Sequence, residues 1–332
     1  MSGERYFVSH LTEYDYGGPV ALARHSLHLT PRALPWQQVE SHEIRISPQG
    51  VQRRRSEDAF GNPVEHLTIT QAHDRLSVLA ESWLCVDARP PVSERDSPAW
   101  ESVREALVFR AGRPPHPAEL EATQFLFESR HVRLKRELAH WAAACFDPGQ
   151  PLLAGVRALS ERIHDEFEFD NEATHVATPV REVLEHGRGV CQDFAHLMLS
   201  GLRSLGLAAR YVSGYLLTTP PPGKPRLLGA DASHAWVAVW CPLHGWVEYD
   251  PTNGVSAAEG HITLGWGRDF ADVTPLRGVL HGGGGHEPEI EVSVIPEAEY
   301  ESLMRAAAEK DADDADEEAA TPATASTVAA PK

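Results

Sequence analysis

The sequence lacks the long apolar runs that cross a membrane, because nowhere do about eighteen apolar residues follow one another. Residues 1–10 also lack an apolar stretch flanked by lysine or arginine, which is the pattern of a secretory signal. We therefore expect a cytoplasmic protein that does not bind a membrane.

Basic residues are in short supply. The chain has 30 lysines and arginines against 48 aspartates and glutamates, which gives a formal net charge of −18. Proteins that bind nucleic acid need clustered lysine and arginine to displace counterions from the phosphate backbone. This shortage excludes nucleic acid as an expected partner, even though part of the acidity lies in residues 301–332.

Cysteine is also scarce, with four residues spread over a chain of 332: Cys85, Cys145, Cys191 and Cys241. Wide and uneven spacing in a chain of this length favours free thiols over a disulfide framework. The 18 histidines are scattered and form no HxxxH pair, and no CxxC motif is present. We expect no metal and no cofactor, but a thiol that is available for chemistry.

The pattern of residues 1–90 predicts an amino-terminal β-domain. Apolar and polar residues alternate with a period of two in Ser26–Thr30, Glu43–Ser47 and Leu67–Thr70. Turn residues separate these runs, as at Gly61–Pro63.

The pattern changes after residue 90. Residues 91–150 predict a helical connecting segment, with one long helical stretch over Glu119–Phe146. We assign residues 151–300 to a second folded unit, the core, that includes a late strand at Ile290–Ile295. Residues 301–332 are rich in alanine and acidic residues and should be disordered, because they cannot bury enough apolar surface. The fold class is therefore α+β.

Cys191 is placed where a thiol becomes a nucleophile. Apolar residues recur at helical spacing from Phe194 to Leu205, and Gly206 is a suitable C-terminal cap. The glycine-bearing segment Gly187–Val190 therefore delivers Cys191 to the first turn of a buried helix. The unpaired N–H groups and the positive end of the helix dipole stabilise a thiolate there. The alternative is an inert buried cysteine.

Two alternating runs, Ser233–Trp240 and Trp246–Asp250, predict an antiparallel hairpin. A turn centred on Pro242 would place His234 and Asp250 directly opposite each other on one face. The carboxylate could then accept the imidazole N–H while the other ring nitrogen faces an incoming thiol. A simple cross-strand polar pair remains the alternative.

Four ordered motifs carry a resemblance to a known family. The segments Gly189–His196 (GVCQDFAH), Ala209–Tyr215, Ser233–Trp236 and Asp250–Asn253 (DPTN) closely resemble the bacterial transglutaminase-like family. The amino-terminal strands, including Asp58–Asn62 (DAFGN), look like the β-domain that precedes the core in that family.

The resemblance implies a β-sandwich-like domain followed by a papain-like core, in which the helix bearing the cysteine packs on an antiparallel sheet. It implies Cys191 as nucleophile, His234 as general base and acid, and Asp250 as the residue that orients the imidazole. The substrate would be a peptide or protein, and the reaction an acyl transfer through a thioester. Peptide or isopeptide hydrolysis is the expected outcome, with transamidation as the alternative.

Animal transglutaminases place a tryptophan upstream of the cysteine, but none lies between Ala142 and Ser233. This departure favours hydrolysis and leaves Gln192 as a candidate for the second oxyanion donor, beside the Cys191 N–H. Among the strand tryptophans, Trp236 is the best candidate to line a substrate groove, with a place in the apolar core as the alternative. A binding or scaffold protein that keeps the fold without the chemistry remains the alternative from another class. The oligomeric state is not predicted.

Overall fold

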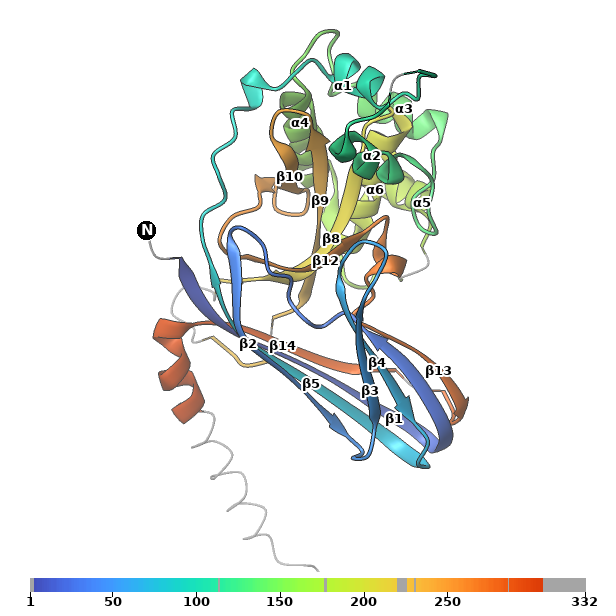
Figure 1. The fold of residues 1–332 in the computed structure, drawn as a ribbon, viewed down its shortest axis with the longest axis vertical. Coiled ribbons are helices and arrows are strands. Elements are labelled where there is room, and N and C mark those ends of the chain that lie inside the picture. The colour runs from blue at the N-terminus through green and yellow to red at the C-terminus, as the bar shows by residue number, and fades with distance from the viewer. Residues whose placement is uncertain are drawn as a thin grey trace, which may run out of the picture.

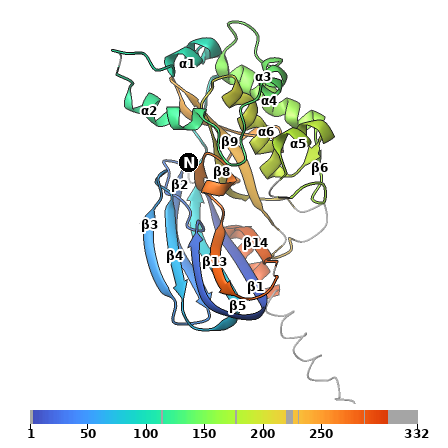
Figure 2. The ribbon, with the colours of Figure 1, turned by 90° about the vertical axis from the view of Figure 1, so that its right-hand side faces the viewer.

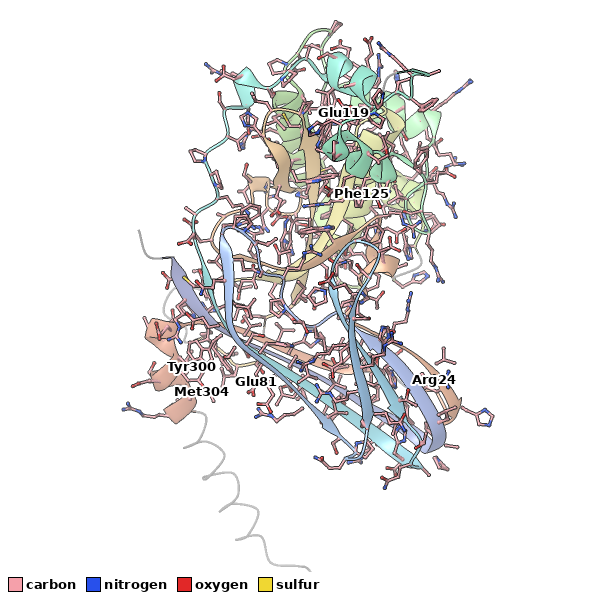
Figure 3. The ribbon with its side chains drawn as sticks, viewed as in Figure 1. Arg24, Glu81, Glu119, Phe125, Tyr300 and Met304 are labelled. Carbon is pink, nitrogen blue, oxygen red and sulfur yellow. The ribbon has the colours of Figure 1, made fainter. Side chains whose placement is uncertain are left out.

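The chain was analysed as a computed structural model, which describes residues 3–112, 114–175, 178–219, 226–229, 231–285 and 287–306. Within these ranges, no helix is both long and apolar enough to span a bilayer. Of the predicted tail, residues 301–332, the part from residue 307 onward lies outside the described residues. Residues 297–306 are helical, so the expected disorder at 301–306 is wrong. Tyr300, which is labelled in Figure 3, explains this, because its ring centroid lies 4.8 Å from that of Phe7 and 4.8 Å from that of Trp83.

The amino-terminal strands form the predicted β-domain (Figure 1). Its first five strands are β1 (Glu4–Leu27), β2 (Gln37–Ser47), β3 (Gln52–Glu57), β4 (Pro63–Ile69) and β5 (His73–Val86), in the order β2-β5-β1-β4-β3. Residues 4–15 of β1 pair with β5, whereas residues 23–27 pair with β4. Side chains from both halves of β1 meet in one apolar core with Leu67, Ile69 and Val78.

Two late strands complete this domain rather than the catalytic core. β13 (Leu276–Gly282) pairs with the second half of β1, and β14 (Glu289–Pro296) pairs with the first half. Assigning all of residues 151–300 to the core was therefore wrong for these strands. The reason is physical: β1 needs partners on both edges, and only the returning chain supplies the second.

The connecting segment is helical but broken. It contains η1 (Glu94–Asp96), α1 (Trp100–Ala106), α2 (Pro117–Thr123), η2 (Gln124–Leu126) and α3 (Arg136–Ala143). The predicted continuous helix over Glu119–Phe146 is wrong, because carboxylates compete for its backbone donors. The N–H of His131 donates to Asp269 at 2.7 Å, and the N–H of Leu134 donates to Glu128 at 2.9 Å.

The core domain packs helices on one antiparallel sheet, as predicted. Its strands are β8 (Ala209–Leu216), β9 (Ser233–Cys241), β10 (Gly245–Asp250), β11 (Val255–Ser256) and β12 (His261–Gly267), in the order β11-β10-β9-β8-β12. The helices are α4 (Leu152–Glu166), α5 (Val180–His186) and α6 (Cys191–Ser204), with η3 (Phe270–Asp272) after β12. α6 contacts β8 and β9 and is also covered by α3 and α4 (Figure 1).

An apolar cluster joins the β1 and β14 side of the β-domain to β8 and β12 of the core domain. Figure 2 shows the two domains one above the other. Polar contacts fix the same junction: Gln37 bonds the backbone N–H and C=O of Thr263, each at 2.8 Å. The β-domain therefore packs against β12, the edge strand of the core sheet. Other strands of the same sheet carry the candidate site.

Candidate active site

Cys191 is the first residue of α6, as the sequence predicted. The short parallel pair of β6 (Glu168–Phe169) and β7 (Arg188–Gly189) leads the chain into this helix. Asp193 then accepts the Val190 N–H at 3.0 Å and the Thr174 hydroxyl at 2.6 Å. These bonds fix the first turn, so the thiol has a defined position at the end of the helix where the N–H groups point outward.

The β9–β10 hairpin supplies the other two predicted residues, with a different register. Trp246 pairs with Trp240 and Tyr249 with Val237, so the turn is centred on Leu243 rather than Pro242. His234 and Asp250 are thus diagonal neighbours and not directly opposite. The cause is the loop Pro242–His244, closed by Gly245 with a φ of 71°, since three-residue hairpin loops require a left-handed residue at this point.

The shifted register still brings His234 and Asp250 together. The His234 Nε2–H donates to Asp250 Oδ2 at 2.8 Å, which leaves the other ring nitrogen for the hydrogen bond with the Cys191 thiol. The three predicted residues therefore form one continuous hydrogen-bonded chain from α6 to β10. Burial opposes protonation of the His234 imidazole, but its bonds to Asp250 and Cys191 prevail and raise its pKa to about 10.

Asp250 is the most firmly held residue of these three. Its side chain has no exposed surface. Oδ2 also accepts the Asn253 side-chain N–H at 2.6 Å, and Oδ1 accepts the backbone N–H groups of Thr252 and Asn253 at 2.9 and 3.3 Å. Burial alone would raise the pKa of Asp250, but hydrogen bonds from His234, His261 and Asn253 hold it well below its usual range.

His261 is a site residue that the sequence did not reveal. Its Nδ1 accepts the backbone N–H of Ala258 at 3.1 Å, so the ring proton must reside on Nε2. Nε2 lies 3.1 Å from Asp250 Oδ2 and donates to it. No local pattern marks this histidine, because it reaches Asp250 only through the pairing of β12 with β8 at the far edge of the sheet.

His234, Asp250 and His261 also place their donor atoms within 4.8 Å of one another, a spacing that could hold a metal ion. Coordination would need a bare Nε2 on His261. The Ala258 N–H excludes this, because it already occupies the other nitrogen as a donor. The donor set therefore fits a hydrogen-bonded carboxylate better than a metal centre.

Replacing His261 with alanine should lower the free energy of unfolding by about 1–3 kcal/mol, because a buried carboxylate loses a donor. Urea denaturation measures this loss. His281→Ala, at an exposed position of β13, is the matched control and should leave stability unchanged. Equal stability of both variants and the parent protein would show that the His261 bond does not hold Asp250.

The raised pKa of His234 predicts how stability depends on pH. In the unfolded chain a histidine titrates near about 6.5, whereas the folded pKa is about 10. The pairing therefore stabilises the fold fully below about pH 6.5 and is lost as the pH rises toward 10. Urea unfolding of the parent protein and His234→Gln at several pH values should show a stability gap that narrows across this range. A gap that widens would contradict the assignment.

Trp236 does not line an open groove, so its predicted role as a substrate-binding residue is wrong for this structure. The side chain has no exposed surface and lies beside His234, with the ring centroids 6.0 Å apart. Its Nε1–H donates to Glu248 at 3.0 Å, and Glu248 pairs with Arg89 at 2.9 Å. A Cβ on Gly214 would lie 2.6 Å from the Trp236 ring, so only glycine leaves this room. Trp236 therefore packs against the His234 imidazole.

Gln192 lies at the second position of α6 and is half-buried, next to the thiol. The N–H groups of Cys191 and Gln192 cannot be satisfied by the helix itself, since the first helical bonds begin with Asp193 and Phe194, both of which donate to Val190. Such a pair of backbone donors suits an oxyanion. All four cysteines are free, as predicted, and Cys191 is partly exposed.

Both the sequence and the fold of this chain are similar to those of known proteins. Residues 6–84 match the bacterial transglutaminase-like N-terminal region, and residues 139–251 match the transglutaminase-like superfamily. The uncharacterized protein Rv2569c of Mycobacterium tuberculosis is 38% identical over 305 residues, which cover 89% of this chain and 94% of that protein. A protein-glutamine gamma-glutamyltransferase of Pseudomonas aeruginosa is 39% identical over 69 residues, which cover 20% of this chain and 10% of that enzyme.

Among solved structures, a candidate cysteine protease from Cytophaga hutchinsonii has a similar fold. The TM-score is 0.68 at 18% identity, and the match covers 90% of this chain and 92% of that one. At this level of identity the likeness concerns the fold, which includes both the β-domain and the core.

Proposed function

Since the chain belongs to the bacterial transglutaminase-like family, we propose that it is a cysteine-dependent enzyme that hydrolyses a peptide or isopeptide bond through a thioester. The observation that carries the proposal is the continuous chain of hydrogen bonds from Cys191 through His234 to Asp250. A histidine–aspartate pair with only a structural role would not need a partly exposed thiol beside the second ring nitrogen of the histidine.

The proposed reaction begins with attack of Cys191 Sγ, as a thiolate paired with the protonated His234, on the carbonyl carbon of an amide, because the pKa of His234 is raised to about 10. The carbonyl oxygen becomes an oxyanion and accepts the N–H of Cys191, with Gln192 as the second donor. The imidazolium then gives its proton to the departing amine, and the C–N bond breaks. The product of this half-reaction is a thioester between the acyl group and Cys191.

Water resolves the thioester in the second half. His234, neutral after the first half, takes a proton from the water molecule, whose oxygen attacks the thioester carbonyl. Cys191 then leaves as a thiolate, and the proton stays on His234, which restores the starting pair. Asp250 stays ionised throughout, because its pKa lies far below neutral. Its role is to hold the Nε2–H of His234, so that the opposite ring nitrogen always faces the thiol.

Transamidation is the second candidate, because the chain resembles the Pseudomonas glutamyltransferase over 69 residues. In that reaction a primary amine replaces water in the second half. Incubation of the protein with casein and monodansylcadaverine separates the two outcomes. New amino termini indicate hydrolysis, and dansyl incorporation indicates transfer. Absence of both products, with protein whose Cys191 is fully reduced, would contradict the proposal.

A further inference from the structure

Arg89 lies in the linker that leaves the β-domain, and its side chain reaches into the core domain. The linker follows β5 and runs along the side of the core domain to η1 (Figure 1). The N–H of Asp87 donates to the Trp36 carbonyl at 2.8 Å, so the β-domain holds the backbone just before Arg89. The guanidinium also lies over the Trp36 ring, 5.6 Å from its centroid. The β-domain therefore determines where this guanidinium lies.

The Arg89 guanidinium donates hydrogen bonds to three acceptors of the core domain. Nη2 donates to the Glu248 carboxylate at 2.9 Å and to the His261 carbonyl at 3.3 Å, and Nη1 donates to the Ala258 carbonyl. The N–H groups of a guanidinium point in fixed directions within one plane, so these acceptors are held at a defined spacing. Arg89 thus ties β10 to the turn that leads into β12.

Two of these bonds hold the turn that carries His261. The His261 N–H donates to the Ala258 carbonyl at 3.0 Å, and the Ala258 N–H donates to His261 Nδ1 at 3.1 Å. Arg89 binds the carbonyl at each end of this turn. The Ala258 N–H sets the tautomer with which His261 donates to Asp250. The guanidinium therefore holds the backbone on which the bond to Asp250 depends.

The third bond acts on the catalytic histidine from another side. Glu248 Oε2 accepts a hydrogen bond from the Arg89 guanidinium and a second from the Trp236 Nε1–H at 3.0 Å. The centroid of the Trp236 ring lies 6.0 Å from that of His234 and 5.3 Å from that of His261. The position of this ring beside both histidines therefore depends on the Glu248 carboxylate.

The Glu248 carboxylate in turn depends on Arg89. The Glu248 side chain is 2% exposed and the Arg89 side chain 13%. Among the described residues, Arg89 is the cation that is hydrogen-bonded to Glu248, whereas Arg210 attracts it through space. A buried carboxylate that loses its paired cation is strongly disfavoured. Removal of Arg89 should therefore displace Glu248, and the Trp236 ring with it.

We propose that Arg89 is a positioning residue for the chemistry of Cys191: it orients the His234 imidazole through the turn and the carboxylate that its guanidinium binds. The inference rests on the proposed function, because His234 is the group that would accept and donate the proton. It also gives the β-domain a part in the reaction, since the arginine that this domain holds completes the support of the site.

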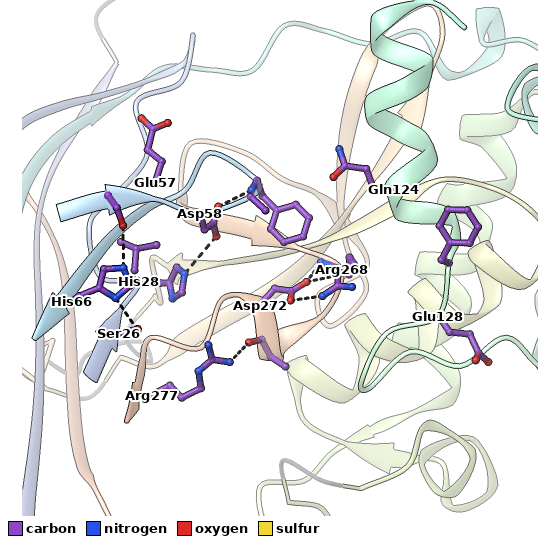
Figure 4. A pocket seen from close by; sticks show the side chains of 16 residues that line it. Ser26, His28, Glu57, Asp58, His66, Gln124, Glu128, Arg268, Asp272 and Arg277 are labelled. Carbon is purple, nitrogen blue, oxygen red and sulfur yellow. Dashed lines mark hydrogen bonds and ion pairs between the residues drawn. The ribbon is translucent and has the colours of Figure 1, made fainter. Parts of the chain in front are cut away.

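The alternative is that Arg89 only fastens the two domains together. Arg277 makes such a contact at another part of the junction, where its guanidinium donates to the Ala271 carbonyl at 3.1 Å, beside a cavity of about 760 Å³ (Figure 4). This bond joins β13 to η3 and includes neither the β9–β10 hairpin nor the turn that carries His261. Arg277→Gln is therefore the control for contact between the domains.

A second control concerns the linker itself. Arg157 of α4 pairs with Glu94, which follows Arg89 in the linker, at 2.6 Å. Both arginines line one cavity of about 320 Å³. Arg157→Gln removes the same charge and loosens the same linker, but it leaves the bonds from Arg89 to Glu248 and to the His261 turn in place.

The test is the rate at which iodoacetamide labels Cys191 at pH 6 in the full-length protein, because this rate reports the thiolate without any substrate. Arg89→Ala should slow labelling about tenfold, since the imidazole that stabilises the thiolate is no longer held in place. Arg157→Gln and Arg277→Gln should be labelled at the parental rate. Urea denaturation identifies conditions in which each variant is folded. If Arg89→Ala fails to fold, Arg89→Lys should show the same slowing, because an ammonium cannot bind three acceptors in one plane.

Chemical rescue separates the position of the guanidinium from its charge. Removal of the Arg89 side chain leaves space beside the cavity that it lines, so methylguanidinium can enter and bind the same acceptors. Millimolar methylguanidinium should restore most of the labelling rate of Arg89→Ala. Methylammonium has the same charge without the planar set of donors and should not restore it.

Parental labelling of folded Arg89→Ala, an equal loss in either control variant, or equal rescue by the two cations would overturn the proposal.

Cleavage of fluorescein-labelled casein gives a second readout. Arg89→Ala should lower kcat about tenfold and leave KM unchanged, because Arg89 positions the site without contacting the substrate. Labelling that depends on Arg89, without cleavage of casein, would contradict the proposed hydrolase and leave the role of Arg89 standing. Cleavage with an unchanged kcat would contradict the role of Arg89 alone.

Discussion

Cys191→Ala should reduce amide hydrolysis by about 10⁴-fold or more, because no other group in the site can form the thioester. The hydrogen-bonded partner of this thiol, His234, remains in place, so substrate binding should persist while turnover disappears. Steady-state cleavage of a peptide by the parent protein and the variant measures the effect. Mass spectrometry should also find an acyl group on Cys191 only in the parent protein.

Cys241→Ala is the matched control for this variant. Cys241 is fully buried in the core beneath the β9–β10 turn, so its replacement should alter stability but not the chemistry. A Cys191→Ala protein that retains more than a few per cent of the activity would place the nucleophile elsewhere. Loss of activity with Cys241→Ala at unchanged folding would do the same.

Asp250→Asn should have the second largest effect, a loss of about 10⁴-fold in turnover together with about 3–5 kcal/mol of stability. Three donors converge on Oδ2 and two on Oδ1. An asparagine must turn its NH₂ group toward one of these sets, so at least two donors face another donor. The imidazole then loses the acceptor that fixes its tautomer.

Peptide cleavage and urea denaturation, measured on the same Asp250→Asn preparation, separate the two losses. Asp74→Asn is the control, since Asp74 is an exposed residue of β5. The account predicts full activity and stability for this control. An Asp250→Asn protein with parental turnover would show that the carboxylate does not orient His234.

The sequence predicted those parts of the fold that local patterns encode. Period-two alternation located parts of β2 and β4 and the β9–β10 hairpin, but not β3 or β5. The apolar spacing after Cys191 gave the start of α6 to the residue. The four motifs that resemble the family identified Cys191, His234 and Asp250 as candidate site residues. In the structure these three side chains form one hydrogen-bonded chain.

The parts that sequence reasoning missed depend on contacts between distant segments. β13 and β14 join β1 across more than 230 residues, and no local pattern records that pairing. His261 meets Asp250 only after the sheet has formed. The long predicted helix breaks because Asp269, from beyond β12, takes the N–H of His131. The hairpin register depended on a left-handed glycine, whose effect on the turn centre was not counted.

The most direct test of the central claim is the rate of iodoacetamide labelling of each cysteine at several pH values, in the parent protein and in His234→Ala. Burial raises the pKa of the Cys85 and Cys145 thiols, so these residues serve as internal standards that react slowly near neutral pH. The account predicts that at pH 6 Cys191 is labelled at least tenfold faster than either, and that His234→Ala removes this advantage. Equal labelling of the three cysteines, or a rate at Cys191 that is unaffected by His234→Ala, would contradict an activated Cys191–His234 pair.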